Sequence, residues 1–342
     1  MFKISIIIPF YNTSKYIDRC LNSLINQTIG IENLQLILVD DASTDDTPVR
    51  LKEYEQKFPE QITLILCEEN GKQGTARNIG LKYAVAPYIG YIDSDDWVEL
   101  DMFEKMYEKI TTYNCDIVNC KIFRDDAIGT YEYKKETGKP DSLILIEDDK
   151  HRESFIVSEI IGVGAPDKLY KKEFLIKNNI TFPEKIAYED IYFGSLLYLY
   201  ANKIYIIEEN LYHYYVNWNS TVLQMDKPYH ADILTVGELK LAEFSKRGIL
   251  DKYPLATEYN FVKTYYLASL KVLILRYTVP SYELFLRIKK RTREVVPNYK
   301  LNPYFENAFS EVYQLLLELL DCDVSESDFQ QIVALVKQLA GK

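Results

Sequence analysis

The stretch Tyr88-Ile89-Gly90-Tyr91-Ile92-Asp93-Ser94-Asp95-Asp96-Trp97 decides the fold of this chain. Its apolar half, residues 88–92, is typical of a buried β-strand, and three carboxylates follow it at Asp93, Asp95 and Asp96. Ligands of open α/β sheets bind at the carboxyl ends of the strands. Clustered carboxylates offer hard oxygen ligands that suit Mg²⁺ or Mn²⁺, and both ions also bind phosphates. The stretch therefore predicts a divalent metal that holds a phosphorylated, nucleotide-linked substrate.

A structural reading of the same carboxylates is that they form a turn and cap a helix that begins near Val98, because Asp is favoured at both kinds of position. Their crowding argues against this reading, since like charges so close together repel unless a cation or hydrogen-bond donors offset them. The local sequence leaves both readings open.

The first 120 residues alternate between strand-like and helix-like segments. We expect strands at 3–8, 34–39, 62–67, 88–92 and 116–123, and helices at 15–27, 47–57, 74–84 and 102–111. Pro9 follows the first strand and is expected to end it, because proline cannot donate to a ladder. Strict alternation with continuously apolar strands predicts an α/β fold with a mostly parallel sheet and helices on both faces.

After residue 120 the sequence pattern changes twice. Residues 125–150 are polar and predict a loop or a solvated hairpin. Residues 151–216 contain both helical and strand periodicities, and we expect helices near 152–160 and 188–200 and strands near 168–170, 203–207 and 211–216. Beyond about residue 225 the pattern is helical, as at 233–246, 259–276, 281–295 and 310–320. We therefore expect a domain at 1–224, with halves at 1–120 and 121–224, and an α-helical region at 225–342.

The composition argues against some classes of function. Lysine and arginine number 40 against 51 aspartates and glutamates, so the net charge is −11, which argues against nucleic-acid binding. The five cysteines lack metal-ligand spacing and are typical of reduced thiols. The N-terminus has no signal-peptide layout, and no window reaches the roughly 18 apolar residues of a membrane span. We expect a cytoplasmic protein, which can still contact the inner face of the cell membrane.

Polar side chains follow each of the first three strands. Tyr11 comes after the first strand, where a base could stack on its ring, and Asp40 and Asp41 follow the second. Asp41 could accept a hydrogen bond from a uracil N–H, although turn formation explains this pair equally well. After the third strand, residues 70–80 supply glycines, a helix N-terminus and Arg77, which suit a pyrophosphate. This loop has neither the Walker A spacing nor the dinucleotide Gly-x-Gly-x-x-Gly pattern.

Two later features carry candidate roles. Glu189 and Asp190 begin a helix, where acidic residues complement the helix dipole, and either carboxylate could also act as a general base. His213 lies in an aromatic strand, where packing and ligand roles are both open. Either role in catalysis requires these residues to meet the 93–96 turn in space.

Taken in order, the motifs resemble those of glycosyltransferase family 2. They are strand-Pro-x-Tyr-Asn from Pro9, strand-Asp-Asp-x-Ser-x-Asp from Asp40, Asn-Gly-x-x-x-x-Ala-Arg-Asn-x-Gly from Asn70, strand-Asp-x-Asp-Asp from Asp93, then Glu189-Asp190 and a Tyr-His strand at His213. The resemblance covers about residues 3–222. It implies the GT-A fold, a UDP-sugar donor, Mn²⁺ or Mg²⁺, and a single in-line displacement that inverts the anomeric carbon.

The resemblance also implies roles for single residues. Asp190 would be the general base, while Asp95, together with Asp93, would ligate the metal, with His213 at the metal or the diphosphate. Nucleotide-sugar contacts would come from the strand ends: Pro9 and Tyr11 at the nucleoside, Asp41 at the uracil, Asn70 and Arg77 near the base and phosphates, Asp93 at the ribose, and also Asp40 and Ser94. Asp40 and Asp96 are adjacent to such positions and could be structural instead.

The chain departs from the processive members of the family, because it has neither membrane helices nor a Gln-x-x-Arg-Trp motif, and this favours addition of one sugar. The helical region lies outside the resemblance and could serve acceptor recognition or formation of a homo-oligomer. Its basic run Lys289-Lys290-Arg291 with Arg293 could contact an anionic membrane surface or could simply be a solvated helix face.

The resemblance therefore implies a metal-dependent inverting glycosyltransferase that moves one sugar from a UDP-sugar to a hydroxyl of a glycan, glycoprotein or lipid-linked acceptor. Bacterial surface polysaccharide or glycoprotein synthesis is the expected setting. Two alternatives remain: a sugar-phosphate nucleotidyltransferase, whose Gly-rich signature is missing near residue 10, and a non-catalytic nucleotide-sugar-binding protein on the same fold.

Overall fold

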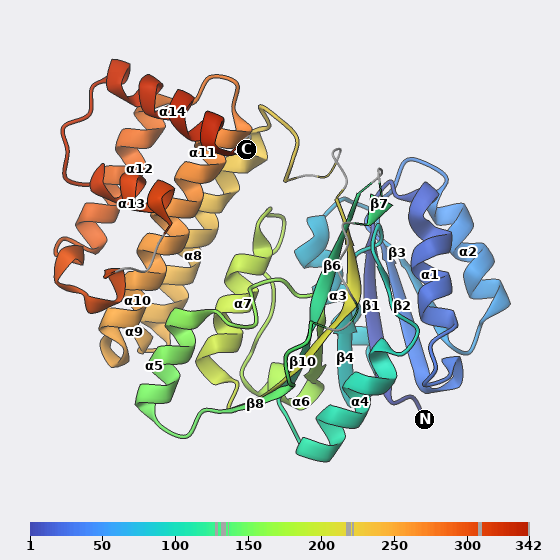
Figure 1. The fold of residues 1–342 in the computed structure, drawn as a ribbon. Coiled ribbons are helices and arrows are strands. Elements are labelled where there is room, and N and C mark those ends of the chain that lie inside the picture. The colour runs from blue at the N-terminus through green and yellow to red at the C-terminus, as the bar shows by residue number, and fades with distance from the viewer. Residues whose placement is uncertain are drawn as a thin grey trace. The chain divides into compact units, whose positions relative to one another are not determined.

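The computed structural model describes residues 1–126, 129–130, 135, 137–216, 220, 222–306 and 310–340 (Figure 1). Internal contacts divide the chain into two compact units: Met1–Arg152 with Glu159–Asn217, and Glu153–Ser158 with Trp218–Lys342. The division predicted from the sequence lies at 224/225.

The first unit is built on one sheet, and its first half is parallel. The strand order β3-β2-β1-β4 is formed by β3 (Ile62–Leu66), β2 (Leu34–Asp40), β1 (Ile4–Phe10) and β4 (Tyr88–Tyr91). β2 and β3 are thus added on one side of β1, and β4 is added on the other side. The crevice between β1 and β4 is the topological switch point of the sheet, where ligands of such folds bind.

Beyond β4 the sheet becomes mixed. β9 (Lys168–Lys171) runs antiparallel to β4 and to β6 (Ile117–Asp126), and β6 pairs in parallel with β10 (Lys203–Tyr215). Three short strands are antiparallel to their neighbours: β5 (Trp97–Val98) and β8 (Ser142–Leu145) on β10, and β7 (Gly129–Thr130) on β6. The predicted α/β class and the parallel half are confirmed, and the mixed half adds strands from the region predicted to be a loop or hairpin.

Two local predictions are wrong for identifiable reasons, and one open reading is excluded. The helix after the acidic turn begins at Met102, as predicted, and not near Val98 as the capping reading required, because Trp97–Val98 pairs with β10. The two strands predicted at 203–207 and 211–216 are one strand with register shifts between Ile206 and Tyr212. β1 continues through Pro9 to Phe10 and pairs with β2 along this whole stretch. Its pairing with β4 ends at Ile7, so the missing N–H of Pro9 falls beyond the ladder with β4.

Helices cover both faces of the sheet. Ile4, Ile6 and Ile8 of β1 pack in one core with α1, α2 and α4, while Ile7 points to the opposite face and meets α3. The helices that belong wholly to this unit are α1 (Ile17–Ile25), α2 (Thr47–Lys57), α3 (Lys72–Tyr83), α4 (Met102–Tyr113), α6 (Lys172–Lys177) and α7 (Glu189–Tyr200), with the short turns η1 (Ser14–Tyr16) and η2 (Ile31–Asn33). α5 (Asp149–Ser158) begins in the first unit and ends in the second.

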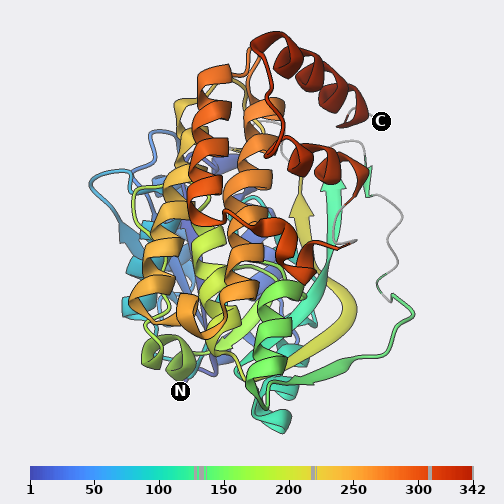
Figure 2. The ribbon, with the colours of Figure 1, turned by 90° about the vertical axis from the view of Figure 1, so that its left-hand side faces the viewer.

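The second unit is helical. Its long segments are α8 (Asp232–Lys246), a continuous run of α10 (Pro254–Phe261), the π-helical η4 (Val262–Ala268) and α11 (Ser269–Arg276), and α12 (Tyr282–Val295), and they lie side by side in Figure 2. Shorter elements complete it: η3 (Pro228–Ala231), α9 (Ile249–Lys252), η5 (Tyr299–Leu301), η6 (Pro303–Phe305), α13 (Glu311–Glu318) and α14 (Glu326–Ala340). Among the helices in the described ranges, none has the length and apolar character that a membrane crossing requires.

The close approach of α3 to β1 depends on Gly80. A Cβ at this position would lie 2.4 Å from Cγ2 of Ile7, and both residues are buried. We predict that Gly80→Ala lowers the free energy of unfolding by about 1–3 kcal/mol through overpacking, measured by urea denaturation. The matched control is Gly164→Ala, whose new Cβ would meet only Pro166 at 4.0 Å. Equal stability of the two variants would refute the tight α3–β1 packing.

Candidate active site

The three carboxylates of the turn after β4 differ in burial and in their contacts. The carbonyl of Asp93 accepts the N–H of Asp96 at 3.0 Å, which closes the turn. Asp96 is buried and accepts hydrogen bonds from the Tyr212 hydroxyl and, at 2.7 Å, from the Tyr215 N–H, so it fastens the turn to β10. Asp95 remains half-buried. Asp96 therefore has the turn role of the structural reading, although it caps no helix, and Asp93 and Asp95 remain as candidate ligands.

Arg77 on α3 is the centre of the site. Its side chain has no exposed surface, and its guanidinium contacts three carboxylates: Nη2 lies 2.7 Å from Asp93, and Nη1 lies 2.7 Å from Glu189 and 3.0 Å from Asp190. The ring of Phe182 lies 5.1 Å from the guanidinium carbon. Residues more than a hundred positions apart in the sequence are thus joined by one buried cation.

The sequence predicted that Arg77 contacts the base and phosphates of a nucleotide. Complete burial leaves its guanidinium no exposed nitrogen for such a contact, and both of its terminal nitrogens already donate to carboxylates. The role that fits this geometry is to position Asp93, Glu189 and Asp190.

Small and amide side chains on α3 let the 182–190 segment reach Arg77. A Cβ on Gly74 would lie 2.7 Å from the carbonyl oxygen of Pro183, so only glycine allows this approach. One turn later, Asn78 donates to the carbonyl of Phe182 at 2.8 Å and accepts the N–H of the same residue at 3.0 Å. The Ala-Arg-Asn sequence of α3 therefore holds the segment that leads into α7.

Glu189 and Asp190 occupy the first turn of α7, directly after Tyr188, whose φ of 63° lies in the left-handed region. The helix dipole favours acidic residues there. The three carboxylate side chains around Arg77 differ in solvent exposure: Glu189 is 7% exposed, Asp93 19% and Asp190 32%. Asp190 is therefore the member of the cluster with most access to an incoming substrate.

The surroundings of Asp190 also suit proton transfer. Burial of its carboxyl group raises its pKa to about 7; attraction to Arg77 opposes this rise, and repulsion from Glu189 and Asp93 adds to it. A general base works best when its pKa lies near the operating pH. Neither the raised pKa nor the shared guanidinium could be read from the Glu-Asp pair alone.

The loops after β1, β2 and β3 are fastened to one another along the same edge of the sheet. Oδ1 of Asn12 accepts the N–H of Thr44 at 2.8 Å, and Oδ1 of Asp41 accepts the N–H of Gly71 at 2.8 Å. Burial raises the pKa of Asp41, although the hydrogen bonds from the Gly71 and Lys72 amides oppose it. Left-handed φ values of 52° to 64° recur in these loops, at Asn12, Ala42 and Lys72. Strained backbone of this kind gathers at functional sites.

The other predicted nucleotide residues differ in access. The Tyr11 side chain is 48% exposed at the end of β1, and Asn70 is also exposed, with its amide donating to the Asp41 carbonyl at 3.2 Å. Pro9, Ser94 and Asp40 are buried. Asp40 accepts the N–H of Ser43 at 3.2 Å, which agrees with the turn role left open for it. The nucleotide contacts themselves remain predictions.

His213 is held on all sides by protein. Its Nδ1 lies 2.7 Å from Asp125 and its Nε2 2.9 Å from Glu99, while its ring stacks between Trp97 and Phe123. A metal could bind either nitrogen only after one of these contacts breaks. The metal role of His213 therefore remains a prediction that requires rearrangement.

Arg19 is a candidate that the sequence did not reveal. Its guanidinium donates to the Asp95 carbonyl at 2.7 Å and lies 3.8 Å from the centre of the Trp97 ring and 4.6 Å from that of Tyr215. A half-exposed cation beside the carboxylate turn could meet an anionic substrate. On α1 it appears as an ordinary polar residue of an amphipathic helix, so only the fold brings it to the site.

The donor set suits a metal that shares its coordination with a substrate. Among the described residues, no group of three or more His, Cys, Asp or Glu side chains could hold a metal ion. Mg²⁺ and Mn²⁺ commonly use one or two carboxylates and complete their shells with phosphates and water. Asp93 and Asp95, two positions apart in one turn, fit such a set.

The fold is an α/β domain of the GT-A type. Its sheet has a parallel half in the order β3-β2-β1-β4 and a mixed half beyond β4, and an acidic turn lies at the switch point. The crystal structure of S. aureus TarS shares this fold over 94% of this chain and 53% of TarS, with a TM-score of 0.64 and 23% identity. TarS 1–349 in complex with UDP-GlcNAc matches 91% of this chain, covering 93% of that structure, with a TM-score of 0.55 and 20% identity.

Sequence comparison gives the family. Residues 5–174 match the model of Glycosyl transferase family 2, and the chain belongs to that family. A poly(ribitol-phosphate) beta-glucosyltransferase of Bacillus spizizenii is 33% identical over 215 residues, 63% of this chain, and the minor teichoic acid biosynthesis protein GgaB of Bacillus subtilis is 35% identical over 217 residues, 62% of this chain. The chain spans about a third or less of these relatives, 32% and 23%.

The buried cation generates a prediction about stability. In Arg77→Met the three carboxylates lose their counter-charge, and breaking a buried ion pair costs about 3–5 kcal/mol. In the variant the three carboxylates repel one another without a counter-charge, and protonation relieves this repulsion, so the stability of the variant is best preserved at acid pH and falls as the pH rises. We expect the loss relative to wild type, followed by thermal unfolding, to be larger at pH 8 than at pH 5.

The control for this prediction is Arg50→Met, which removes a surface pair with Asp18 whose side chains are 30% and 61% exposed. Such pairs contribute about 0–1 kcal/mol. A loss in Arg77→Met no larger than in this control would contradict the buried cluster.

Proposed function

We propose that this chain transfers one sugar from a nucleotide-sugar donor to a hydroxyl of a cell-surface polymer, with Asp190 as the general base. The observation that carries the proposal is the convergence of Asp93 and Asp190 on Arg77 at the switch point of the sheet. It brings the candidate metal turn and the candidate base into one site, as a displacement at a sugar–phosphate bond requires.

The donor is proposed to be a UDP-sugar. TarS, which shares the fold, has been crystallised with UDP-GlcNAc and with UDP. Here the exposed ring of Tyr11 offers a stacking surface beside the loop that Asp41 and Asn70 hold together. Pro9, Asp40 and Ser94 are buried, so we propose that they shape the pocket without exposed contacts of their own.

Asp93 and Asp95 would hold the Mn²⁺ or Mg²⁺ ion. When bound, a divalent cation stabilises the negative charge that develops on a diphosphate leaving group. The side chain of Asp93, held by Arg77, is oriented for this before any substrate arrives. Arg19 adds a second positive charge next to the same turn.

In the proposed reaction Asp190 accepts the proton of the acceptor hydroxyl. The acceptor oxygen forms a bond to the anomeric carbon while the bond from that carbon to the phosphate oxygen breaks, and the electron pair leaves with the nucleoside diphosphate. Attack from the opposite face inverts the anomeric centre. Arg77 and Glu189 position Asp190 and do not contact the reacting atoms.

The acceptor is proposed to belong to cell-surface glycopolymer synthesis, because two relatives are named for poly(ribitol-phosphate) and teichoic acid. The reaction would take place in the cytoplasm, with single-sugar rather than processive addition. A nucleotidyltransferase is less well supported, since the family match and the convergence of Asp93 and Asp190 on Arg77 both favour glycosyl transfer.

Replacing the base tests the function. We predict that Asp190→Asn lowers kcat/KM for sugar transfer about 10²- to 10⁴-fold, because the amide cannot accept the proton. Protection of the fold by UDP against heat should persist, because binding to the native state does not require the base. Transfer by the wild type should fall as the pH is lowered through about 7, as Asp190 becomes protonated.

The matched control is Asp46→Asn, the same isosteric change at an exposed residue before α2, which should leave transfer unaffected. Unchanged transfer in Asp190→Asn would exclude this residue as the base.

Replacing the metal ligand gives an independent prediction. Asp95→Ala should remove the part of UDP-dependent thermal protection that Mn²⁺ adds and leave the metal-free part. The readout is the shift in unfolding temperature with UDP, with Mn²⁺ and with both. An Mn²⁺-dependent shift that survives the substitution would contradict the assignment.

A further inference from the structure

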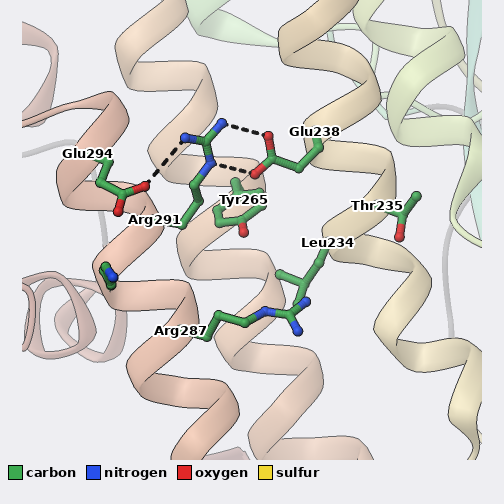
Figure 3. A pocket seen from close by; sticks show the side chains of 8 residues that line it. Leu234, Thr235, Glu238, Tyr265, Arg287, Arg291 and Glu294 are labelled. Carbon is green, nitrogen blue, oxygen red and sulfur yellow. Dashed lines mark hydrogen bonds and ion pairs between the residues drawn. The ribbon is translucent and has the colours of Figure 1, made fainter.

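The helical unit contains a polar groove that the proposed reaction does not use. About 440 Å³ in volume, it lies between α8 and α12, with Tyr265 of η4 and Leu234 of α8 among its lining (Figure 3). One end is closed by Arg291, whose Nε and Nη2 lie 2.7 and 2.9 Å from the carboxylate oxygens of Glu238 on the facing helix. This salt bridge joins α8 and α12, the two helices that form the walls of the groove.

The remaining cations of the groove have no such partner. In the described parts of the chain, neither Arg287 nor Lys290 forms an ion pair with a carboxylate, and both side chains are exposed. Figure 3 shows Arg287 reaching past Tyr265 toward Leu234, away from the Arg291–Glu238 bridge. Two positive charges on one side of a concave surface thus remain available to an anion.

The basic run noted in the sequence does not act as one face. Lys289 is buried, and its ammonium donates to the carbonyl of Cys322. Arg291 is neutralised by Glu238 and by Glu294 at 3.5 Å. Of the run, Lys290 lines the groove without a carboxylate partner among the described residues, and Arg287, one turn earlier on α12, lines it as well. This geometry is better suited to a discrete phosphate group than to a flat membrane surface.

We propose that this groove binds phosphate groups of the acceptor, which makes the acceptor a polymer that carries phosphodiester groups. The inference rests on the proposed function and specifies its acceptor. The chain carries a net charge of −11 and would repel a polyanion over most of its surface. Processing such a polymer therefore requires a local concentration of cations, and Arg287 and Lys290 supply one. The hydroxyl of Thr235, also exposed on the groove, adds a hydrogen-bond donor.

The test is binding of a lipid-free poly(glycerol phosphate) oligomer to the full chain, measured by calorimetry at several salt concentrations. The variant is Arg287→Gln with Lys290→Gln. The matched control is Lys246→Gln with Lys271→Gln, which removes the same charge from exposed positions of the same unit outside the groove. We expect the groove variant to bind the oligomer about tenfold more weakly, or about 1.4 kcal/mol, with a shallower dependence on salt. The control should bind like wild type.

Equal affinity of the groove variant and the control would overturn the proposal. It would also be overturned if the substitutions reduced binding to vesicles containing phosphatidylglycerol but not to the oligomer, since the groove would then serve a membrane. Hydrolysis of the nucleotide-sugar donor without acceptor should be the same in both variants. A different result separates the two proposals. If neither the wild type nor the variants transfer sugar, and oligomer binding still depends on Arg287 and Lys290, then the proposed function is wrong but the phosphate site is supported.

Discussion

A guanidinium group with no exposed surface needs counter-charges, because an unpaired ion in a protein interior carries a desolvation penalty of several kcal/mol. Arg77 meets this requirement with Asp93, Glu189 and Asp190, which come from the end of β4 and the start of α7. The requirement works in both directions. Three carboxylates could not gather at one point without a cation, and the cation could not be buried without them, so the site and the packing of α3 depend on each other.

The surplus of acid in this cluster has a chemical consequence. One cation faces three carboxylates, and burial of the Asp190 carboxyl group raises its pKa, with repulsion from Glu189 and Asp93 adding to the rise. Asp190 shares Nη1 of Arg77 with Glu189 at the longer distance, 3.0 Å against 2.7 Å, and keeps most exposure. The same arrangement that stabilises the fold therefore leaves one carboxylate with a pKa of about 7, within reach of a substrate.

Sequence patterns predicted the parallel half of the fold because its signals are local. The apolar runs at 34–39 and 88–92 coincide closely with β2 and β4, and residues 47–57 form α2 as predicted. Long-range choices could not be read in this way. Trp97–Val98 becomes a strand only because β10 lies beside it, and Arg77 resembles a phosphate ligand until residues 182–190 cover it. The groove between α8 and α12 is likewise lined by the Arg291–Glu238 pair, whose members are far apart in the chain.

The central claim is that Asp190 belongs to a desolvated cluster organised by Arg77, and the titration of its own carboxyl group tests this most directly. Aspartate labelled with ¹³C at the carboxyl carbon reports ionisation by NMR, and comparison with Asp190→Asn assigns the signal. The account predicts a midpoint near pH 7 for Asp190. A midpoint near pH 4, as in an ordinary exposed aspartate, would contradict it.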